Sequence, residues 1–140
     1  MEEAPFFREI EHGSDLAIEV FAPSRLELFA RALEAMGRLM VAPEGIDPIE
    51  TRTVAVGPGT DQEMLHDLLA AALNLFLIDE FVWTTAGVTE KNHGLEAYFT
   101  GERLRVCRHW LLSEIKAVTY HQLSIAQREG QWLARIVFDI

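Results

Sequence analysis

The strongest constraint on the fold is a pattern that occurs twice, in which an apolar strand is followed by a turn and by a helix with a polar cap. In the first copy, residues 16–21 alternate as a strand, and Ser24 is followed three positions later by Glu27. In the second copy, residues 51–56 alternate in the same way, and Thr60 is followed by Glu63. Each pair has the spacing of a capping box, in which the hydroxyl accepts from the amide of the glutamate and the carboxylate reaches back. Two such units suggest a duplicated module.

Helical periodicity follows both caps. The first helix is predicted to run from Ser24 until Pro43 and Gly45 end it, with Leu26, Phe29, Ala30, Leu33, Gly37 and Met40 on its core face. The second is predicted to run from Thr60 to near Asp79. Its apolar face is wide and comprises Met64, Leu65, Leu68, Leu69, Ala72, Leu73, Phe76 and Leu77. Because its apolar face is the wider one, we expect the second helix to be the more buried.

Further strands are predicted at residues 6–12, 81–90, 95–100, 118–126 and 131–138. Asn92 and Gly94 suit the positive φ angles of a tight turn between two of them. Residues 101–116 show no clean period and are predicted to form a loop that carries some functional residues. The predicted fold is α+β: a single domain over residues 1–140, made of two strand–helix–strand–strand modules, with a mostly antiparallel sheet packed on two main helices.

Charge and composition restrict the partners. The formal net charge is −10, with 12 Lys and Arg against 22 Asp and Glu. Binding to a nucleic-acid backbone depends on clustered Lys and Arg, so no strong direct binding to nucleic acid is expected. Docking on a basic protein, or binding of a cation, fits the charge better. No apolar stretch reaches the ~18 residues of a membrane helix, so no membrane partner is expected.

The cysteine count and the start of the sequence bear on location. A single cysteine, Cys107, rules out an internal disulfide, and the acidic residues Glu2 and Glu3 stand where a signal peptide would be basic. A cytoplasmic protein is therefore expected. The neighbouring Arg105, Arg108 and His109 could activate the thiol of Cys107, but we favour a buried, inert cysteine.

The C-terminal residues are unusual. The apolar run from Trp132 to Phe138 is typical of a core strand, and it is followed directly by Asp139 and Ile140. A strand that keeps its shape to the end would hold the Asp139 side chain and the Ile140 α-carboxylate in fixed positions. Two hard oxygen groups placed together favour a cation or a hydrogen-bond donor.

Two other segments contain residues suited to chemistry. In Glu11-His-Gly-Ser-Asp15, Asp15 could offer oxygen to a metal, although Gly, Ser and Asp are also common turn formers. Tyr120 and His121 are predicted to lie on a strand, where partly buried amphipathic residues are more common than catalysts. The sequence contains no glycine-rich phosphate loop, cysteine pair, His-Glu-x-x-His motif or Gly-x-Ser-x-Gly elbow.

Taken together, these segments resemble the archease family. The landmarks occur in the family's order: Glu11-His12-Gly-Ser-Asp15, Gly101-Glu102 with His109 following, Glu114 to His121, and the terminal Asp139-Ile140. The Lys-Ala-Val-Thr-Tyr-His segment and the terminal Asp-Ile are the most specific. The first motif departs from the family pattern, because Gly13 and Ser14 replace a Thr-Ala pair and Ala17 replaces a glycine. His12 and Asp15 are retained.

The resemblance implies a non-catalytic accessory protein. Archeases activate the GTP-dependent RNA ligase of tRNA splicing and RNA repair, by promoting its guanylylation and its multiple turnover. The family binds a divalent cation, most often calcium, with magnesium or manganese as alternatives, and the ligands carry over to Asp15, Asp139 and Ile140. We hypothesise that His12, Lys116 and His121 support the site or the partner surface.

Two other functions remain open from the residues alone. One is a metal-dependent hydrolase that uses His12, Asp15, His121 and Asp139 with a metal-bound water, although the His-rich ligand set of catalytic zinc is missing. The other is a small-molecule binding module whose apolar cleft is lined by Trp83, Trp110 and Trp132.

Overall fold

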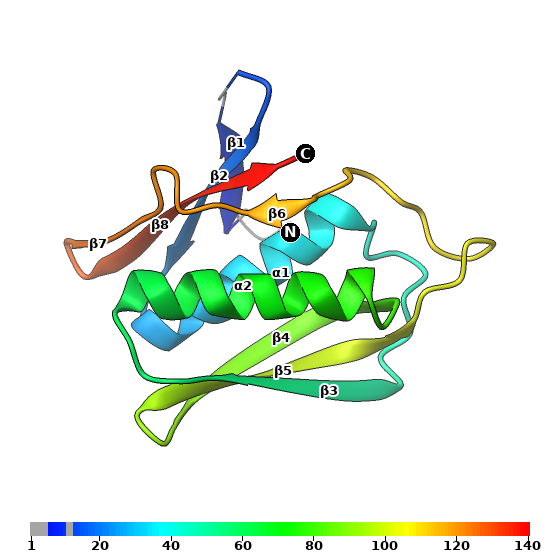
Figure 1. The fold of residues 1–140 in the computed structure, drawn as a ribbon, viewed down its shortest axis with the longest axis horizontal. Helices are drawn as coiled ribbons and strands as arrows, with labels where there is room; N and C mark the ends of the chain where they lie inside the picture. Colours follow the sequence, from blue (N-terminus) through cyan, green and yellow to red (C-terminus); the bar gives the residue numbers. More distant parts are fainter. Residues whose placement is uncertain (1–5, 11–12) are drawn as a thin grey trace.

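Two antiparallel sheets pack with two helices in the computed structural model, which describes residues 6–10 and 13–140 (Figure 1). The elements are β1 (Phe7–Ile10), β2 (Leu16–Ala22), α1 (Arg25–Met40), β3 (Glu50–Val56), α2 (Asp61–Leu77), β4 (Phe81–Lys91), β5 (Gly94–Arg103), β6 (Ala117–Val118), β7 (Ser124–Arg128) and β8 (Gln131–Asp139). The larger sheet has the order β1-β2-β8-β6, with β7 also paired to β8, and the smaller has the order β3-β5-β4. The predicted α+β class is confirmed. Within the described residues, no helix has the length and apolar character needed to cross a membrane.

The two modules are nested, one inside the other. In the segment β3-α2-β4-β5, the first strand pairs with the last and the last pairs with the middle one. The segment β2-α1-β7-β8 shows the same pairing, because β2 pairs with β8 and β8 pairs with β7. The second module is therefore inserted between α1 and β7 of the first. This insertion brings β8, the last strand, into the centre of the larger sheet beside β2.

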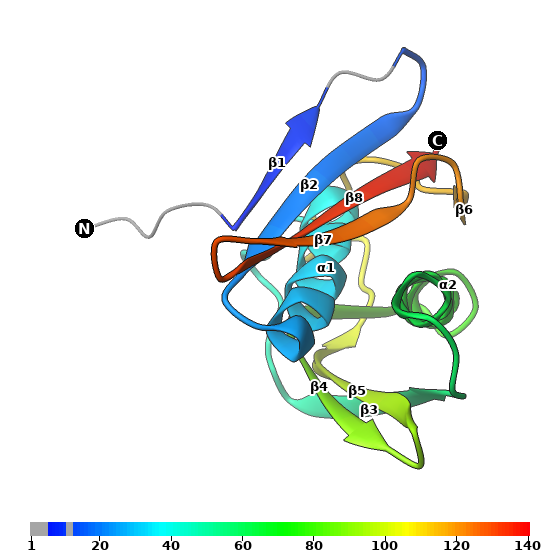
Figure 2. The same cartoon turned by 90° about the vertical axis from the view of Figure 1, so that its left-hand side faces the viewer.

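The first helix is the more buried one, contrary to the sequence-based expectation. Ten of the 16 residues of α1 are buried, against seven of the 17 in α2. Figure 2 shows the reason: α1 lies between the two sheets, whereas α2 lies at the side of the molecule. Small residues of α1 permit this close packing. A Cβ added at Gly37 would lie 2.7 Å from the ring nitrogen of Trp83, so only glycine fits there.

The two helix caps differ. At α2 the capping box is complete, since the Glu63 amide donates to Thr60 Oγ1 over 3.1 Å and the Thr60 amide donates to the Glu63 carboxylate over 3.0 Å. At α1 only half of the predicted box forms: the Glu27 amide donates to Ser24 Oγ over 3.3 Å. The Glu27 carboxylate accepts from Arg31 instead, one turn further along the helix.

Several predicted boundaries are wrong. Residues 118–126 do not form one strand, because β6 ends at Val118 and β7 begins at Ser124. Strand β5 extends to Arg103, so Gly101 and Glu102 belong to a strand and not to a loop. In the turn of residues 91–94, the positive φ angles belong to Asn92 and His93. Gly94 is required for another reason: a Cβ there would lie 2.1 Å from the Val56 carbonyl oxygen.

Candidate functional site

Asp139 ends β8, and Asp15 directly precedes the neighbouring strand β2, at one end of the larger sheet. The pairing of the two strands begins at Leu16 and Phe138, so Asp15 and Asp139 are the next residues outward from this pair. On the other side of β8, Ala117 pairs with Asp139, and the Lys116 amide donates to the Asp139 carbonyl oxygen over 2.7 Å. Figure 1 shows the C-terminus beside β6 at this end of the sheet. The fold thus brings together residues that are far apart in the sequence.

The Asp139 carboxylate stands on a rigid support and faces outward. Phe138 is fully buried in the core, whereas Asp139 is exposed and the Ile140 side chain is 46% exposed. None of the residues in 6–10 and 13–140 donates a hydrogen bond to the Asp139 side chain. Asp15 is partly buried and directly precedes β2. A fixed and exposed carboxylate next to a second one can bind a hard cation or the donor of a partner protein.

The composition of this site limits what it can bind. Within the described part of the chain, no three His, Cys, Asp or Glu side chains are grouped closely enough to hold a metal ion. Asp15 and Asp139 are two carboxylates, so a cation would need further oxygens, which the Ile140 α-carboxylate and water can supply. All of these donors are hard oxygens, and they fit calcium or magnesium better than zinc. His12, a predicted supporting residue, lies outside the described residues.

Lys116 and His121 occupy different positions relative to this edge. Lys116 is exposed and directly precedes β6, whose first residue, Ala117, pairs with Asp139. His121 lies in the turn between β6 and β7, and its amide donates to Thr119 Oγ1 over 3.2 Å. The prediction of a strand through Tyr120 and His121 is therefore wrong. The Tyr120 ring is 56% exposed and stacks on His66, with 3.9 Å between the ring centroids.

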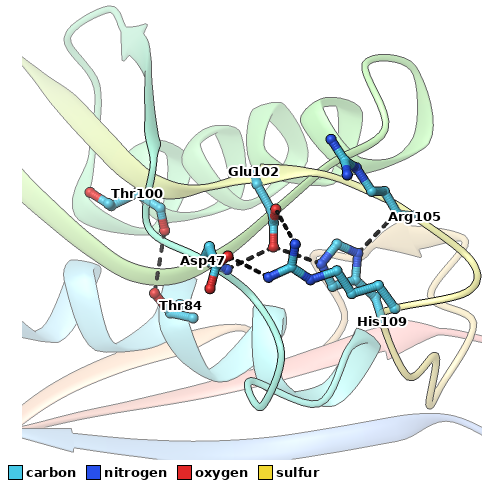
Figure 3. A network of polar contacts seen from close by, with 7 residues as sticks. Asp47, Thr84, Thr100, Glu102, Arg105 and His109 are labelled. Carbon is cyan, nitrogen blue, oxygen red and sulfur yellow. Dashed lines mark hydrogen bonds and ion pairs between the residues drawn. The ribbon is translucent and has the colours of Figure 1, made fainter.

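A second polar group, unassigned by the sequence, surrounds Glu102 at the end of β5 (Figure 3). Glu102 and His109 are both buried, and Glu102 Oε2 lies 2.9 Å from His109 Nε2. The same carboxylate oxygen accepts from the Asp47 amide over 2.7 Å. Arg108 pairs with the Asp47 carboxylate and lies 3.8 Å from Glu102 Oε1. Glu102 therefore has its charge compensated from within the chain.

The hydrogen bonds of His109 determine its tautomer. Its Nδ1 accepts from the Arg105 amide over 2.9 Å, so in the neutral ring the proton is carried by Nε2, which donates to Glu102. The pKa of Glu102 is lowered, mainly because the Asp47 amide stabilises the carboxylate and then because of the bond from His109. Glu102 is thus held ionised, and the network ties residues 105–109 to β5 and to the segment after α1.

Sequence reasoning missed this network because both of its buried members lie in a polar stretch without periodicity. Glu102 and His109 were noted in the sequence as residues of the family motifs, but no function was assigned to them. The prediction for Cys107 is also wrong: this cysteine is exposed, because the network anchors its neighbours and leaves its own side chain on the outer side of the loop.

The three tryptophans do not share a cleft. Trp83 is buried in the core, where its ring nitrogen donates to the Leu33 carbonyl over 3.1 Å and its ring packs edge-on against Phe99. Trp110 is exposed on the loop between β5 and β6. Trp132 is half-buried on β8, where it pairs with Ala22. The alternative of an apolar cleft lined by all three tryptophans is therefore not supported.

Comparison with known proteins identifies relatives over nearly the whole chain. The model of the Archease protein family matches residues 7–140. The chain is 30% identical to protein archease from Methanopyrus kandleri over 138 residues, which cover 96% of this chain and 99% of that protein. It is likewise 30% identical to protein archease from Methanosarcina mazei over 139 residues, with 96% and 95% covered.

Solved structures show the same fold. The solution structure of Methanobacterium thermoautotrophicum protein 1598 matches with a TM-score of 0.80 at 24% identity, covering 96% of this chain and 99% of that one. The crystal structure of an archease from Thermotoga maritima matches with a TM-score of 0.62 at 23% identity, covering 100% of this chain and 98% of that one.

Proposed function

The chain belongs to the archease family, and from this premise we propose that it is a non-catalytic accessory factor of a GTP-dependent RNA-splicing ligase. It promotes guanylylation of the ligase and allows multiple turnover in tRNA splicing or RNA repair in the cytoplasm. The observation that supports this most strongly is the position of Asp15 and Asp139, which directly follow the paired residues Leu16 and Phe138 at one end of the larger sheet. The identity of the ligase as partner rests on family membership, and the proposed contact with it rests on the geometry of this end of the sheet.

The charge of the chain supports an action on the ligase and not on RNA. A net charge of −10 disfavours direct competition for the RNA backbone, since like charges repel. The same charge favours approach to a basic active-site mouth, because opposite charges steer association. Asp139 is exposed on a strand whose preceding residue, Phe138, is fully buried, so its carboxylate is pre-positioned for such an approach.

We further propose that Asp15, Asp139 and the Ile140 α-carboxylate hold a divalent cation, with calcium first and magnesium or manganese as alternatives. When bound, the cation would neutralise the adjacent carboxylates and order the edge that meets the ligase. Lys116, on the other side of β8, and His121, in the β6–β7 turn, would contribute to the partner surface. His12 is assigned a supporting role by its position in the first motif.

A ligation assay tests the proposed function. The cognate ligase is given GTP, a divalent cation and an excess of broken RNA, with and without this protein. The expected result is one round of joining, or fewer, without the protein, and many rounds with it. Asp139→Ala should remove the stimulation while the thermal unfolding curve stays unchanged. Full multiple turnover with that variant, or with no added protein, would contradict the proposal.

The role of the terminal carboxylate has its own test. Adding two glycines after Ile140 moves the α-carboxylate and keeps every side chain in place. Calcium affinity, measured by isothermal titration calorimetry, should fall at least tenfold, which is about 1.4 kcal/mol. Unchanged affinity in the extended chain would exclude Ile140 as a ligand and leave Asp15 and Asp139 to be examined alone.

A further inference from the structure

The loop between β5 and β6 exposes large apolar side chains that the proposed function does not use. Val106 is 82% exposed and Trp110 is 75% exposed, and Leu111 and Leu112 are about half exposed. At the end of α2, Leu77 and Ile78 are also exposed. Single exposed apolar residues are ordinary, but four within seven positions of one loop are typical of an interaction site. We call Val106, Trp110, Leu111 and Leu112 the loop surface.

A groove adjoins the loop surface. It has a volume of about 280 Å³ and is lined by Met40, Phe76, Leu111, Leu112, Ser113 and Glu114. Most of these side chains are apolar, and they come from α1, from α2 and from the loop itself. A concave apolar site of this kind accepts an apolar side chain from another molecule.

The loop surface is held in place by backbone bonds. The Ala42 amide donates to the Trp110 carbonyl over 2.9 Å, and the Leu112 amide donates to the Met40 carbonyl over 2.8 Å. Val41 and Leu111 form a β-bridge. On the other side of Trp110, the buried bond between Glu102 and His109 anchors the start of the loop. The exposed side chains are therefore presented by an ordered backbone, which lowers the entropic cost of binding.

The start of the loop is rich in arginine, unlike the chain as a whole. Arg103, Arg105 and Arg108 lie within six positions of one another in a protein with a net charge of −10. Arg103 Nη2 lies 3.6 Å from Glu80 Oε2, and the Arg108 guanidinium pairs with the Asp47 carboxylate. In the part of the chain that the structure describes, no carboxylate lies within ion-pair distance of Arg105, and Figure 3 shows its guanidinium turned away from the network. This arginine is available to a carboxylate of a partner.

We propose that the loop surface and its groove form a second docking site for the ligase, and that they bind an apolar side chain flanked by a carboxylate. The identity of the partner rests on the proposed function, while the chemistry of the partner rests on the residues described above. Trp and Arg, which Trp110 and Arg105 supply here, are enriched in protein–protein hot spots. Single-stranded RNA would instead need several aromatic side chains for stacking, and here one Trp stands among aliphatic residues.

We call Asp15, Asp139 and the Ile140 α-carboxylate the carboxylate edge. The chain connects the loop surface directly to this edge. The chain runs from Leu112 through Glu114 and the buried Ile115 to Lys116, whose amide bonds to Asp139. Docking at the loop surface would therefore fix the orientation of Asp139 relative to the ligase. The loop surface would supply affinity, and the carboxylate edge would supply activation.

Binding of the purified ligase, measured by isothermal titration calorimetry beside a ligation assay, tests this proposal. Trp110→Ala and Arg105→Glu should each weaken the Kd at least tenfold, and the effect of Arg105→Glu should shrink as salt rises. Arg128→Glu is the matched control, because Arg128 is exposed on the β7–β8 hairpin at the opposite end of the molecule (Figure 1). It should leave the Kd unchanged. Thermal unfolding should be unchanged in Trp110→Ala, because its side chain is mostly exposed.

The outcomes separate this proposal from the proposed function. If the wild-type chain binds and stimulates the ligase, and Trp110→Ala and Arg105→Glu bind equally well, the second docking site is refuted and the proposed function stands. If the wild-type chain neither binds nor stimulates, both fail. Concentration-dependent self-association that Trp110→Ala abolishes would assign the surface to a second copy. Binding of single-stranded RNA that Arg105→Glu abolishes would assign it to RNA. Either result would overturn the ligase as occupant.

Discussion

Glu102 and Asp139 are two carboxylates near the ends of central strands, and they differ in burial and in hydrogen bonding. We call Glu102 the closed carboxylate and Asp139 the open carboxylate. Glu102 is buried, and its oxygens are met by the Asp47 amide, by His109 and by the more distant Arg108. Asp139 is exposed, and none of the described residues donates a hydrogen bond to its carboxylate. A carboxylate compensated inside the chain stabilises the fold, while one held rigidly without compensation is left for a ligand. Acidity alone therefore does not identify a site.

The largest expected effect concerns the open carboxylate. Asp139→Asn removes one charge and keeps the shape of the side chain, so calcium binding should become undetectable by isothermal titration calorimetry under conditions where the wild type saturates. The free energy of unfolding without calcium should change by less than about 0.5 kcal/mol, as for other exposed positions. Wild-type calcium affinity in this variant would remove Asp139 from the site.

The closed carboxylate should behave in the reverse manner. His109→Ala removes one hydrogen bond from the buried Glu102 carboxylate, which keeps the bond from the Asp47 amide, and leaves the Arg105 amide without its partner; such a loss costs about 1–3 kcal/mol. Urea denaturation should show this loss, and calcium affinity should stay at the wild-type value. Arg128→Ala is the control at an exposed position. A stable His109→Ala protein with weakened calcium binding would mean that the two regions are coupled.

A substitution at the N-cap of α2 should cause a smaller loss of stability. It tests whether destabilisation alone reduces the stimulation of the ligase. Thr60→Ala removes the complete capping box of α2, which should cost about 1 kcal/mol. Thermal unfolding should shift to lower temperature, with ligase stimulation unchanged well below the transition. Thr60→Ser keeps the cap and should match the wild type. Loss of stimulation in Thr60→Ala at low temperature would show that the edge depends on global stability.

The smallest expected effect is the loss of stability at acid pH when the Glu102 carboxylate becomes protonated. The pKa of Glu102 is lowered from its ordinary value of 4.5 by the bonds from Asp47 and His109. Its contribution to stability is therefore complete above that ordinary value and is lost as the pH falls through the lower value of the folded state. Below pH 4.5, the stability of the wild type should approach that of Glu102→Gln. A constant difference between pH 7 and pH 3 would contradict the assignment.

Regular patterns in the sequence predicted most of the fold. The alternation of residues 16–21 and 51–56, and the caps at Ser24 and Thr60, mark elements that local interactions already favour, and the structure contains all of them. The duplicated module was also visible. The nesting of one module in the other was not, because it depends on which strands pair across the chain. The greater burial of α1 follows from its place between the two sheets, and its own sequence does not reveal it.

The candidate site was predictable only in part. Asp15 and Asp139 were predicted to share a site from the family resemblance, and the structure places them next to the paired residues Leu16 and Phe138 of neighbouring strands. The network of Glu102 and His109 was not predictable, because buried polar residues in an irregular segment leave no periodic signal. For the same reason, the ordered backbone of the loop surface could not be predicted from the sequence. Tyr120 was misplaced because a short strand, β6, stops two residues earlier, at Val118.

The most direct test compares two substitutions of the same chemistry in one multiple-turnover ligation assay. Asp139→Asn and Glu102→Gln each replace a carboxylate by an amide, one at the open edge and one in the closed network. At a temperature well below both unfolding transitions, Asp139→Asn should lose the stimulation of the ligase and Glu102→Gln should keep it. Full stimulation by Asp139→Asn would contradict the account, whatever the result with Glu102→Gln.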